Sequence, residues 1–382
     1  MGATVASVSR PRSRDARATA GQVQTVLGAL ERDDLGIVLP HEHLLGTFGW
    51  PEDAAGQARA PMSLESLWSV NANPYLSRDN LTLDDRDAAA GELEHYRALG
   101  GGAIVELTTR GLAPDPDGLR LLSVRTGVPI VAGTGWYVAT HRGPEFAALP
   151  EQDVAEQMAA DIRDGFPGTN VRAGIIGELG IGGLRPRSGI GRVGELGPGD
   201  QKLLGAAARA QRATGAAISI HSPKSNSASV PHATLALGLL DVLEAAGADL
   251  TRVVIGHLDR ASEVVEGLLA IARRGAYVEL DSWGSQGYVM PDVLPYPADQ
   301  VRVNASKALL DAGWGAQLLW SHDVCERRQW HRWGAGGFGH LLSKLPPILR
   351  RAGIDDEAMD LIMRRNPARL LPLASPQSEL VD

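Results

Sequence analysis

Two histidines near the start of the chain have the spacing of metal ligands. His41 and His43 lie at the end of the apolar run GIVLPHEHLL, which covers residues 36–45. Side chains at positions i and i+2 of a strand point to the same face, so both imidazoles would leave a buried strand together. Neutral ring nitrogens bind zinc and related metals well. An HxH pair can equally flank a turn without binding anything, so the rest of the chain must decide.

Eight short apolar runs could supply the strands that position such ligands. We predict strands at 36–44, 101–109, 129–135, 173–180, 216–221, 252–257, 276–281 and 317–323. Most are separated by segments with 3.6-residue apolar periodicity, such as 200–215 and 235–250, which we predict to be amphipathic helices ending at glycine. Eight strand–helix pairs with strands apolar on both faces predict an α/β fold of the (β/α)8 type, a TIM barrel. A doubly wound open sheet is the alternative.

The barrel would account for nearly the whole chain as a single domain with long βα loops. We predict residues 1–21 to be a disordered N-terminal arm, 22–372 to be the barrel and 373–382 to be a C-terminal tail. The loops that we expect to be long, and rich in Gly, Pro and Arg, are 46–80, 181–199, 283–302 and 324–339. Loops of this length inside a compact domain are usually functional or disordered.

Composition and charge exclude several classes of protein. The net charge of −8 and the pI of about 5.7 argue against nucleic acid as a partner, because nucleic-acid binding needs a basic surface. Cys325, the single cysteine, excludes an internal disulfide and a cysteine-rich zinc site. No apolar run reaches the length of a membrane span, and the N-terminal arm lacks the apolar core of a secretory signal. We therefore expect a cytoplasmic protein that acts on a small molecule.

More side chains of the same chemistry stand at the ends of other predicted strands. The histidines and carboxylates at strand ends are His41, His43, Glu178, His221, His257 and Asp323. In a (β/α)8 barrel the carboxyl ends of the strands meet at one face, where active sites lie. Four of the ten histidines fall in this set, which favours a metal centre over scattered core histidines. The set exceeds the needs of one tetrahedral metal and fits two divalent ions that share a bridging ligand.

Several longer segments show a resemblance to a known family. They are TVLGALERDDLGIVLPHEHLL, AGIIGELG, LGAAARAQRATGAAISIH, GADLTRVVIGH, RGAYVELDSWG, LLWSHDVC and NPARLL, and together they span about residues 22–372. In this combination the chain resembles the phosphotriesterase family of the amidohydrolase superfamily. The combination is far more specific to that family than the HxH pair alone.

The resemblance implies a binuclear metal site. One ion would be held by His41, His43 and Asp323, and the other by His221 and His257. Some relatives bridge the two ions with a carboxylated lysine, but none of the four lysines lies in the strand at 173–180. The sequence is similar instead to the branch with a glutamate in this strand, so we assign the bridge to Glu178. Zinc is the expected metal, and Mn, Co or Fe would accept the same nitrogen and oxygen ligands.

The resemblance further implies an enzyme, a metal-dependent hydrolase. A metal-bridging hydroxide would attack a carboxylic ester or lactone of a small organic molecule, with Glu178 and Asp323 as the catalytic residues. Asp323 would accept the proton of the hydroxide and pass it to the leaving group, or serve as a ligand alone. The alternatives are an amide (N-acyl) hydrolase or a phosphotriesterase with the same metal centre and, more remotely, a non-catalytic barrel that binds a ligand.

Residues just beyond the strands are expected to bind the substrate. We predict Trp136, Tyr137, Lys224 and Trp283 to line the pocket, because small-molecule sites are often aromatic-walled. Tyr137 stands where relatives that open lactones carry a tyrosine. Ser282, however, stands where those relatives carry an arginine, which departs from the lactonase pattern.

Basic residues are expected to crowd the mouth of the site. They are Arg110, Arg142, Lys224, Arg260, Arg327, Arg328 and Arg332. Their charge predicts an anionic substrate, by electrostatic focusing, unless they are solvated loop charges. The resemblance also makes a homodimer an expectation, because dimers are common among such relatives.

Overall fold

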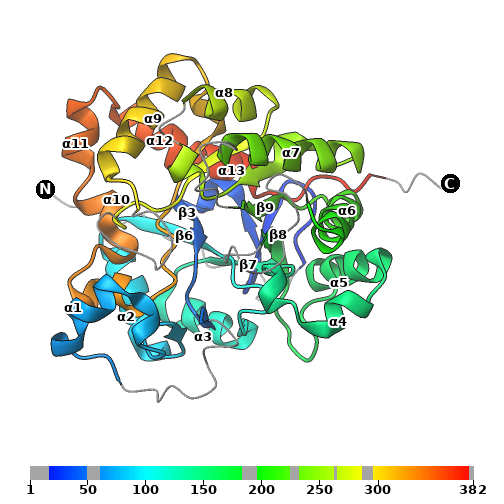
Figure 1. Cartoon of the computed structure of the whole chain (residues 1–382), viewed down its shortest axis with the longest axis horizontal. Helices are drawn as coiled ribbons and strands as arrows, with labels where there is room; N and C mark the ends of the chain where they lie inside the picture. Colours follow the sequence, from blue (N-terminus) through cyan, green and yellow to red (C-terminus); the bar gives the residue numbers. More distant parts are fainter. Residues whose placement is uncertain are drawn as a thin grey trace, which may run out of the picture.

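Eight parallel strands form the central sheet of the computed structural model, which describes residues 17–49, 61–182, 196–223, 232–261, 265–285 and 296–377. The strands are β3 (Ile37–Glu42), β6 (Gly101–Glu106), β7 (Ile130–Thr134), β8 (Ala173–Gly180), β9 (Ile218–His221), β10 (Val253–Ile255), β11 (Tyr277–Leu280) and β12 (Leu318–Trp320). Each pairs in parallel with the next. The N–H of Asp323, just after β12, donates to the carbonyl of His41 in β3 at 3.2 Å, which brings the last strand beside the first. The predicted (β/α)8 barrel is therefore confirmed (Figure 1).

Each predicted strand contains one of the eight observed strands, and β8 has the predicted bounds. The others are shorter, mostly at their carboxyl ends. His257, beyond β10, and Asp323, beyond β12, have φ angles of 60° and 52°. These angles lie in the left-handed region, which a strand cannot continue through. β10 and β12 thus end just before the candidate site residues His257 and Asp323.

Helices cover the outside of the barrel, as Figure 1 shows. The longer helices are α1 (Leu64–Ala72), α2 (Arg86–Ala98), α3 (Pro116–Thr126), α5 (Glu151–Arg163), α6 (Pro198–Thr214), α7 (His232–Ala245), α8 (Val265–Arg273) and α9 (Asp299–Asp311). The shorter ones are α4 (Gly143–Ala148), α10 (His340–Ser343), α11 (Pro346–Arg351), α12 (Asp356–Asp360) and α13 (Asn366–Leu370).

Short 3-10 turns and one π-helical turn connect these elements in the described parts of the chain. The 3-10 turns are η1 (Arg32–Asp34), η2 (Pro74–Leu76), η3 (Ala139–His141), η4 (Leu250–Arg252), η5 (Leu258–Ala261), η6 (Gly315–Gln317), η7 (Arg327–Gln329), η8 (His331–Trp333) and η9 (Gly337–Gly339), and η10 (Leu361–Arg365) is a π-helical turn. None of the described helices combines the length and apolar character that crossing a membrane requires.

The two helices with predicted residue ranges differ in how well their ends were predicted. The helix expected at 200–215 is α6, and Gly215 caps it with a φ of 72°. The helix expected at 235–250 is α7, which ends earlier, at Ala245. Gly247 follows with a φ of 79°, a conformation that stops a helix. The prediction therefore ran past the glycine that ends the helix.

Apolar residues of the strands separate into two layers. One layer fills the barrel interior with residues from seven of the strands and with Ala217, just before β9: Val38, Ala103, Val105, Val131, Ile175, Ala217, Val254, Tyr277 and Leu319. The other lies between the strands and the helices, and it includes Val253 and Ile255. Because side chains alternate along a strand, Val254 faces inward while its two neighbours face outward. This explains why the strands are apolar on both faces.

Two small antiparallel sheets were not predicted. β1 (Gln22–Thr25) and β2 (Gly28–Glu31) form a hairpin whose Val23 joins the interior apolar layer. β4 (Gly46–Thr47) pairs with β5 (Thr82–Leu83) within the first long loop. These strands have two to four residues, too few for a period-two pattern to be recognised.

Some of the predicted segments lie outside the described residues. They are most of the predicted arm, half of the predicted tail and parts of three predicted loops. The ranges outside the described residues are 1–16, 50–60, 183–195, 224–231, 262–264, 286–295 and 378–382.

Candidate metal centre

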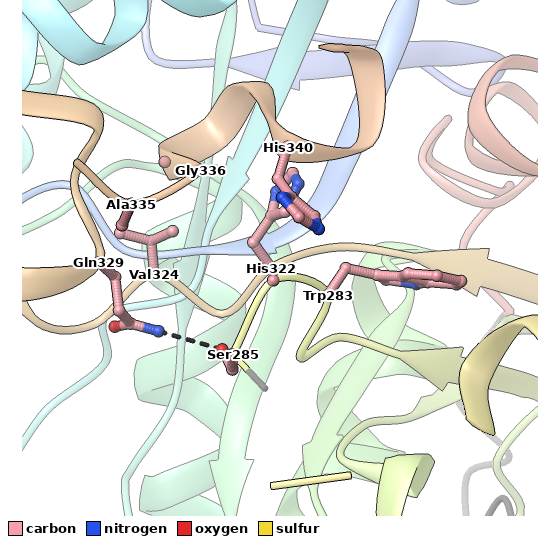
Figure 2. Close-up of a pocket in the computed structure, with 10 residues that line it drawn as sticks. Trp283, Ser285, His322, Val324, Gln329, Ala335, Gly336 and His340 are labelled. Atoms are coloured by element: carbon pink, nitrogen blue, oxygen red, sulfur yellow. Dashed lines mark hydrogen bonds between the residues drawn. The ribbon is translucent and has the colours of Figure 1, made fainter. Parts of the chain in front are cut away.

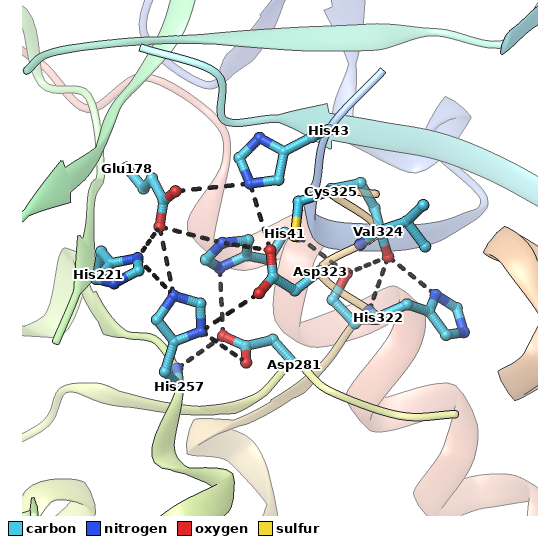
Figure 3. A network of polar contacts seen from close by, with 12 residues as sticks. His41, His43, Glu178, His221, His257, Asp281, His322, Asp323, Val324 and Cys325 are labelled. Carbon is cyan, nitrogen blue, oxygen red and sulfur yellow. Dashed lines mark hydrogen bonds and ion pairs between the residues drawn. The ribbon is translucent and has the colours of Figure 1, made fainter. Parts of the chain in front are cut away.

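The six predicted ligands meet at the carboxyl ends of the strands (Figure 3). His41 is in β3, Glu178 in β8 and His221 at the end of β9. His43, His257 and Asp323 follow β3, β10 and β12. All six are buried, and Asp323 is the most exposed at 8%. Residues spread over nearly three hundred positions thus form one compact cluster.

Glu178 lies at the middle of this cluster and faces all four histidines. Its Oε2 lies 2.9 Å from Nδ1 of His221, 3.4 Å from Nε2 of His41 and 3.5 Å from Nε2 of His257. Its Oε1 lies 3.5 Å from Nε2 of His43. A carboxylate that presents both oxygens to several imidazoles has the geometry of a bridging ligand.

Asp323, which follows β12, faces the same cluster. Its Oδ1 lies 3.4 Å from Nε2 of His43 and 3.8 Å from Nε2 of His41. Its Oδ2 lies 3.8 Å from Nδ1 of His257. These contacts place a second carboxylate against histidines that also face Glu178.

The donor atoms fit divalent cations. The sets His41–Glu178–His257 and His41–His43–Asp323 each offer three ligand atoms within 4.8 Å of one another. Nε2 of His41 is buried and has no hydrogen-bond partner, although two carboxylates lie nearby. A buried polar atom without a partner is costly, and a cation would satisfy it. Imidazole nitrogen with carboxylate oxygen is the ligand chemistry of zinc and of Mn, Co and Fe.

Polar side chains behind the histidines fix their orientation. Nδ1 of His43 lies 3.0 Å from Oγ1 of Thr108, which in turn donates to Glu106 at 2.5 Å. Nδ1 of His41 lies 2.9 Å from Oε2 of Glu279. Sequence reasoning did not select Thr108, Glu106 or Glu279. A signal was present, because glutamates in predicted apolar strands are unexpected unless they bind something.

Burial and neighbouring charges shift the pKa values of the cluster. Burial opposes the charge of His41, but Glu279 and Asp281 outweigh it and raise its pKa well above 6.5. Burial also opposes ionisation of Glu178, yet its pKa lies well below 4.5, chiefly because of His221. Without metal, the cluster therefore pairs protonated imidazole with carboxylate, and a cation would replace the proton.

The predicted substrate residues lie in different surroundings. The ring of Tyr137 packs edge-on against His221 at 5.2 Å between centroids, so it borders the cluster. Its pKa is raised, first by burial and then by Glu178 and Asp323, so the phenol stays protonated. Trp136 turns the other way, to Phe146 of α4 at 5.2 Å. The rings of these adjacent residues thus point to opposite sides of the chain.

Trp283 packs away from the four histidines of the cluster. Trp283 is 1% exposed, packs edge-on against Trp320 at 5.2 Å and lines a small pocket with His322 and His340 (Figure 2). Lys224 lies outside the described residues. Phe48, which sequence reasoning missed, packs edge-on against His43 at 4.8 Å. No local signal marks Phe48, because it is one apolar residue in a long loop.

Five of the seven basic residues expected at the mouth have described side chains, and each of these five has its own counter-ion. Arg110 pairs with Asp161 and Arg142 with Asp200, both at 2.7 Å. The remaining described arginines of that set are paired as well: Arg327 with Asp79 and Asp84, Arg328 with Glu326, and Arg332 with Asp85. Their charge is compensated within the protein, so these five residues do not support the expected anionic substrate. Lys224 and the side chain of Arg260 lie outside the described residues.

Together, the barrel and its buried cluster of imidazoles and carboxylates define a metal-dependent hydrolase of the amidohydrolase type. Residues 21–371 match the model of the Phosphotriesterase family, and the chain belongs to this family. The family depends on two metal ions, so the expected class of enzyme and of cofactor is confirmed, whereas the identity of the metal is not tested.

Similar proteins cover almost the whole chain. It is 33% identical over 360 residues to the N-acetyltaurine hydrolase of Rattus norvegicus, spanning 92% of this chain and 98% of that protein. A resiniferatoxin-binding protein from Rhodobacter sphaeroides is 32% identical with a TM-score of 0.81, covering 92% and 95% of the two chains. A phosphotriesterase homology protein from Escherichia coli, complexed with phosphate in its active site, is 27% identical with a TM-score of 0.71, covering 89% and 99%.

Proposed function

We propose that the chain is a binuclear metal-dependent amide hydrolase that cleaves the N-acyl bond of a small molecule, such as an N-acetylated amino sulfonate or amino acid. The observation that carries this proposal is the 33% identity to an N-acetyltaurine hydrolase over 92% of the chain. From the sequence alone, we predict amide hydrolysis as an alternative to hydrolysis of an ester or lactone. The identity to an amide hydrolase supports the amide alternative better than the ester or lactone. An acylated amino sulfonate or amino acid is itself an anion. The proposal therefore retains the expected anionic substrate without relying on the arginines at the mouth.

We assign the ligands as the family resemblance implied. His41, His43 and Asp323 would hold one ion, His221 and His257 the other, and Glu178 would bridge them. The contacts of Glu178 Oε2 at 2.9–3.5 Å to His41, His221 and His257 support this assignment. When bound, two divalent cations, for which we propose zinc, supply Lewis-acid charge that activates water and polarises the scissile carbonyl.

Asp323 is the residue we assign to proton transfer. Hydrolysis of an amide expels an amine, which leaves far more readily once its nitrogen is protonated. A carboxylate can accept the proton of the attacking water and return it to that nitrogen. Asp323 faces the cluster and is the most exposed of the six residues, so a substrate amine could reach its oxygens.

The wall of the pocket would be aromatic. Tyr137 and Phe48 pack against His221 and His43, from two different loops. We propose that these two rings contact the acyl group of the substrate. Three substrate contacts stay predictions: Trp136, Trp283 and Lys224. The cytoplasmic location, the homodimer and the division of the chain at residues 22 and 372 also stay predictions.

The test is a substrate comparison on metal-loaded protein. Purified chain would be assayed with N-acetyltaurine, N-acetyl amino acids, lactones, aryl esters and phosphotriesters, with Glu178→Ala as the blank and elemental analysis of bound metal. We expect two metal ions per chain and the highest kcat/KM on an N-acyl substrate. A lactone or phosphotriester turned over more efficiently than every amide would overturn the assignment.

A further inference from the structure

Glu279 in β11 and Asp281, the residue just after β11, place carboxylates beside the outer nitrogens of two metal-facing histidines. Oε2 of Glu279 lies 2.9 Å from Nδ1 of His41, and Oδ1 of Asp281 lies 3.0 Å from Nδ1 of His257. Both carboxylates are fully buried. Asp281 comes two positions after Glu279, where the chain leaves β11, and the side chains of both point toward the histidine cluster. One strand thus supports ligands that come from two others.

Asp281 reaches both histidines (Figure 3). Its Oδ2 accepts a hydrogen bond from the backbone N–H of His257 at 2.7 Å and lies 3.3 Å from Nδ1 of His41. His257 has a φ of 60°, a conformation that residues other than glycine seldom adopt. The bond to Asp281 therefore fixes the backbone of His257 as well as its ring. In the proposed ligand set, His41 and His257 belong to different ions.

The contact at Nδ1 decides which ring nitrogen can bind a cation. A carboxylate beside Nδ1 keeps the proton on that nitrogen, which leaves the lone pair of Nε2 for a metal. Nε2 of His41 and Nε2 of His257 lie 3.4 and 3.5 Å from Oε2 of Glu178, on the inner side of the cluster. The outer carboxylates therefore present both rings in the orientation that binding requires.

The stability of the fold does not explain Glu279. Its Oε1 is buried and has no hydrogen-bond partner, and a buried carboxylate with an unsatisfied oxygen destabilises a protein. An apolar side chain fills the barrel interior without that penalty, as Val254 does in the neighbouring strand. A residue that costs stability at a fixed position is expected to serve the site.

We propose that Glu279 and Asp281 are positioning residues that set the metal affinity of the centre in different ways. Glu279 orients His41 and so supports one ion. Asp281 orients both His41 and His257 and so couples the two ion sites. The inference rests on the ligand set proposed above.

The experiment compares Glu279→Gln, Asp281→Asn and the control Asp161→Asn. Asp161 is also a buried carboxylate, but it pairs with Arg110, away from the histidines. Bound zinc per full-length chain would be counted by elemental analysis over a series of buffered free-zinc concentrations. Circular dichroism would verify that each variant is folded.

The two variants should give different binding curves. We expect Glu279→Gln to weaken one of the two zinc ions by about 10- to 100-fold, and Asp281→Asn to weaken both by that factor. The control should match the wild type. Asp281→Glu, which keeps the charge but displaces the oxygens, should also weaken both ions and replaces Asp281→Asn if that variant does not fold.

Two other outcomes are decisive. If Asp281→Asn weakens one ion or neither, the coupling role is wrong; if Glu279→Gln matches the control, so is the role of Glu279. If the wild type itself binds fewer than two ions, the proposed ligand set fails, which is a separate result from failure of the positioning proposal.

Discussion

Glu178 and His221 are in direct contact, with Oε2 of the carboxylate 2.9 Å from Nδ1 of the imidazole, although 43 positions separate them in the chain. The contact joins the ends of the neighbouring strands β8 and β9. Both residues are buried, so the pair is shielded from water. Electrostatic interactions in such surroundings are stronger than at the surface, and the first prediction concerns this carboxylate.

Replacement of Glu178 by alanine should remove the central carboxylate that we assign as the bridge. We expect kcat/KM to fall at least about a hundredfold, the scale of losing one preorganised charged group, together with a loss of bound metal. Steady-state kinetics and elemental analysis would measure both. Glu94→Ala, on the exposed side of α2, serves as the control. Retention of two ions by Glu178→Ala would contradict its role as a bridge.

Replacement of Asp323 by asparagine should separate proton transfer from metal binding. If Asp323 transfers the proton, kcat should fall by about 10²- to 10⁴-fold with metal content retained. Asp323→Glu keeps a carboxylate and should retain more of the rate than Asp323→Asn. Loss of metal in Asp323→Asn, in proportion to the lost rate, would instead indicate a ligand role alone.

Removal of the aromatic wall should weaken substrate binding. We expect Phe48→Ala and Tyr137→Ala each to lower kcat/KM for an N-acyl substrate. The fall should correspond to a loss of about 1–3 kcal/mol of transition-state stabilisation, the effect of losing apolar contact in a pocket. Phe146→Leu, which alters packing beside Trp136 on the outer side of the barrel, should leave kcat/KM unchanged. Equal effects of all three variants would indicate a general loss of folding.

Removal of metal should lower thermal stability. A ligand that binds the native state alone at a free concentration of 100 times its Kd stabilises by about 2.7 kcal/mol, so chelator-treated protein should melt at a lower temperature than zinc-loaded protein. Differential scanning calorimetry would measure both states. The difference should shrink in Glu178→Ala. An identical melting temperature with and without metal would show that the bound ions do not stabilise the fold.

Acidification should destabilise the region around Asp299. Burial raises the pKa of this carboxyl, but hydrogen bonds from His340 and from the N–H of Gly284, with the charge of Arg302, bring it below 3.8. A depressed carboxyl pKa stabilises the fold above the unfolded value and loses that contribution as the pH falls through the folded value. Between about pH 5 and pH 3, the melting temperature of Asp299→Asn should therefore fall less than that of the wild type. Asp356→Asn, at an exposed position, should fall in parallel with the wild type.

Much of the fold could be predicted from periodicity and from local signals. All eight strand predictions contain an observed strand, because residues that are apolar on both faces of a buried strand leave a continuous apolar run. Gly215 correctly marked the end of α6. The hairpin of β1 and β2 could not be found in this way, since four-residue strands carry too few residues for a pattern.

The candidate site was less completely predictable. Strand ends identified the six residues of the cluster, but Trp136 and Tyr137 are adjacent in the sequence and face opposite sides of the barrel wall. Local pattern could not decide which ring turns inward, because β7 ends at Thr134, before both residues, and strand alternation no longer applies there. Phe48 reaches His43 through the path of a long loop, which no periodicity encodes.

By itself, the sequence determined the barrel and the identity of the side chains that its strand ends could offer to metal ions, because alternation along each strand fixes which residues face inward. Tertiary structure alone decided which nitrogen of each imidazole faces the cluster, since that depends on partners such as Glu279 and Asp281 on other strands. It also decided that Arg110 and Arg142 meet Asp161 and Asp200, 51 and 58 positions away. Charge pairing of this kind depends on distance in space, and the distance along the chain does not reveal it.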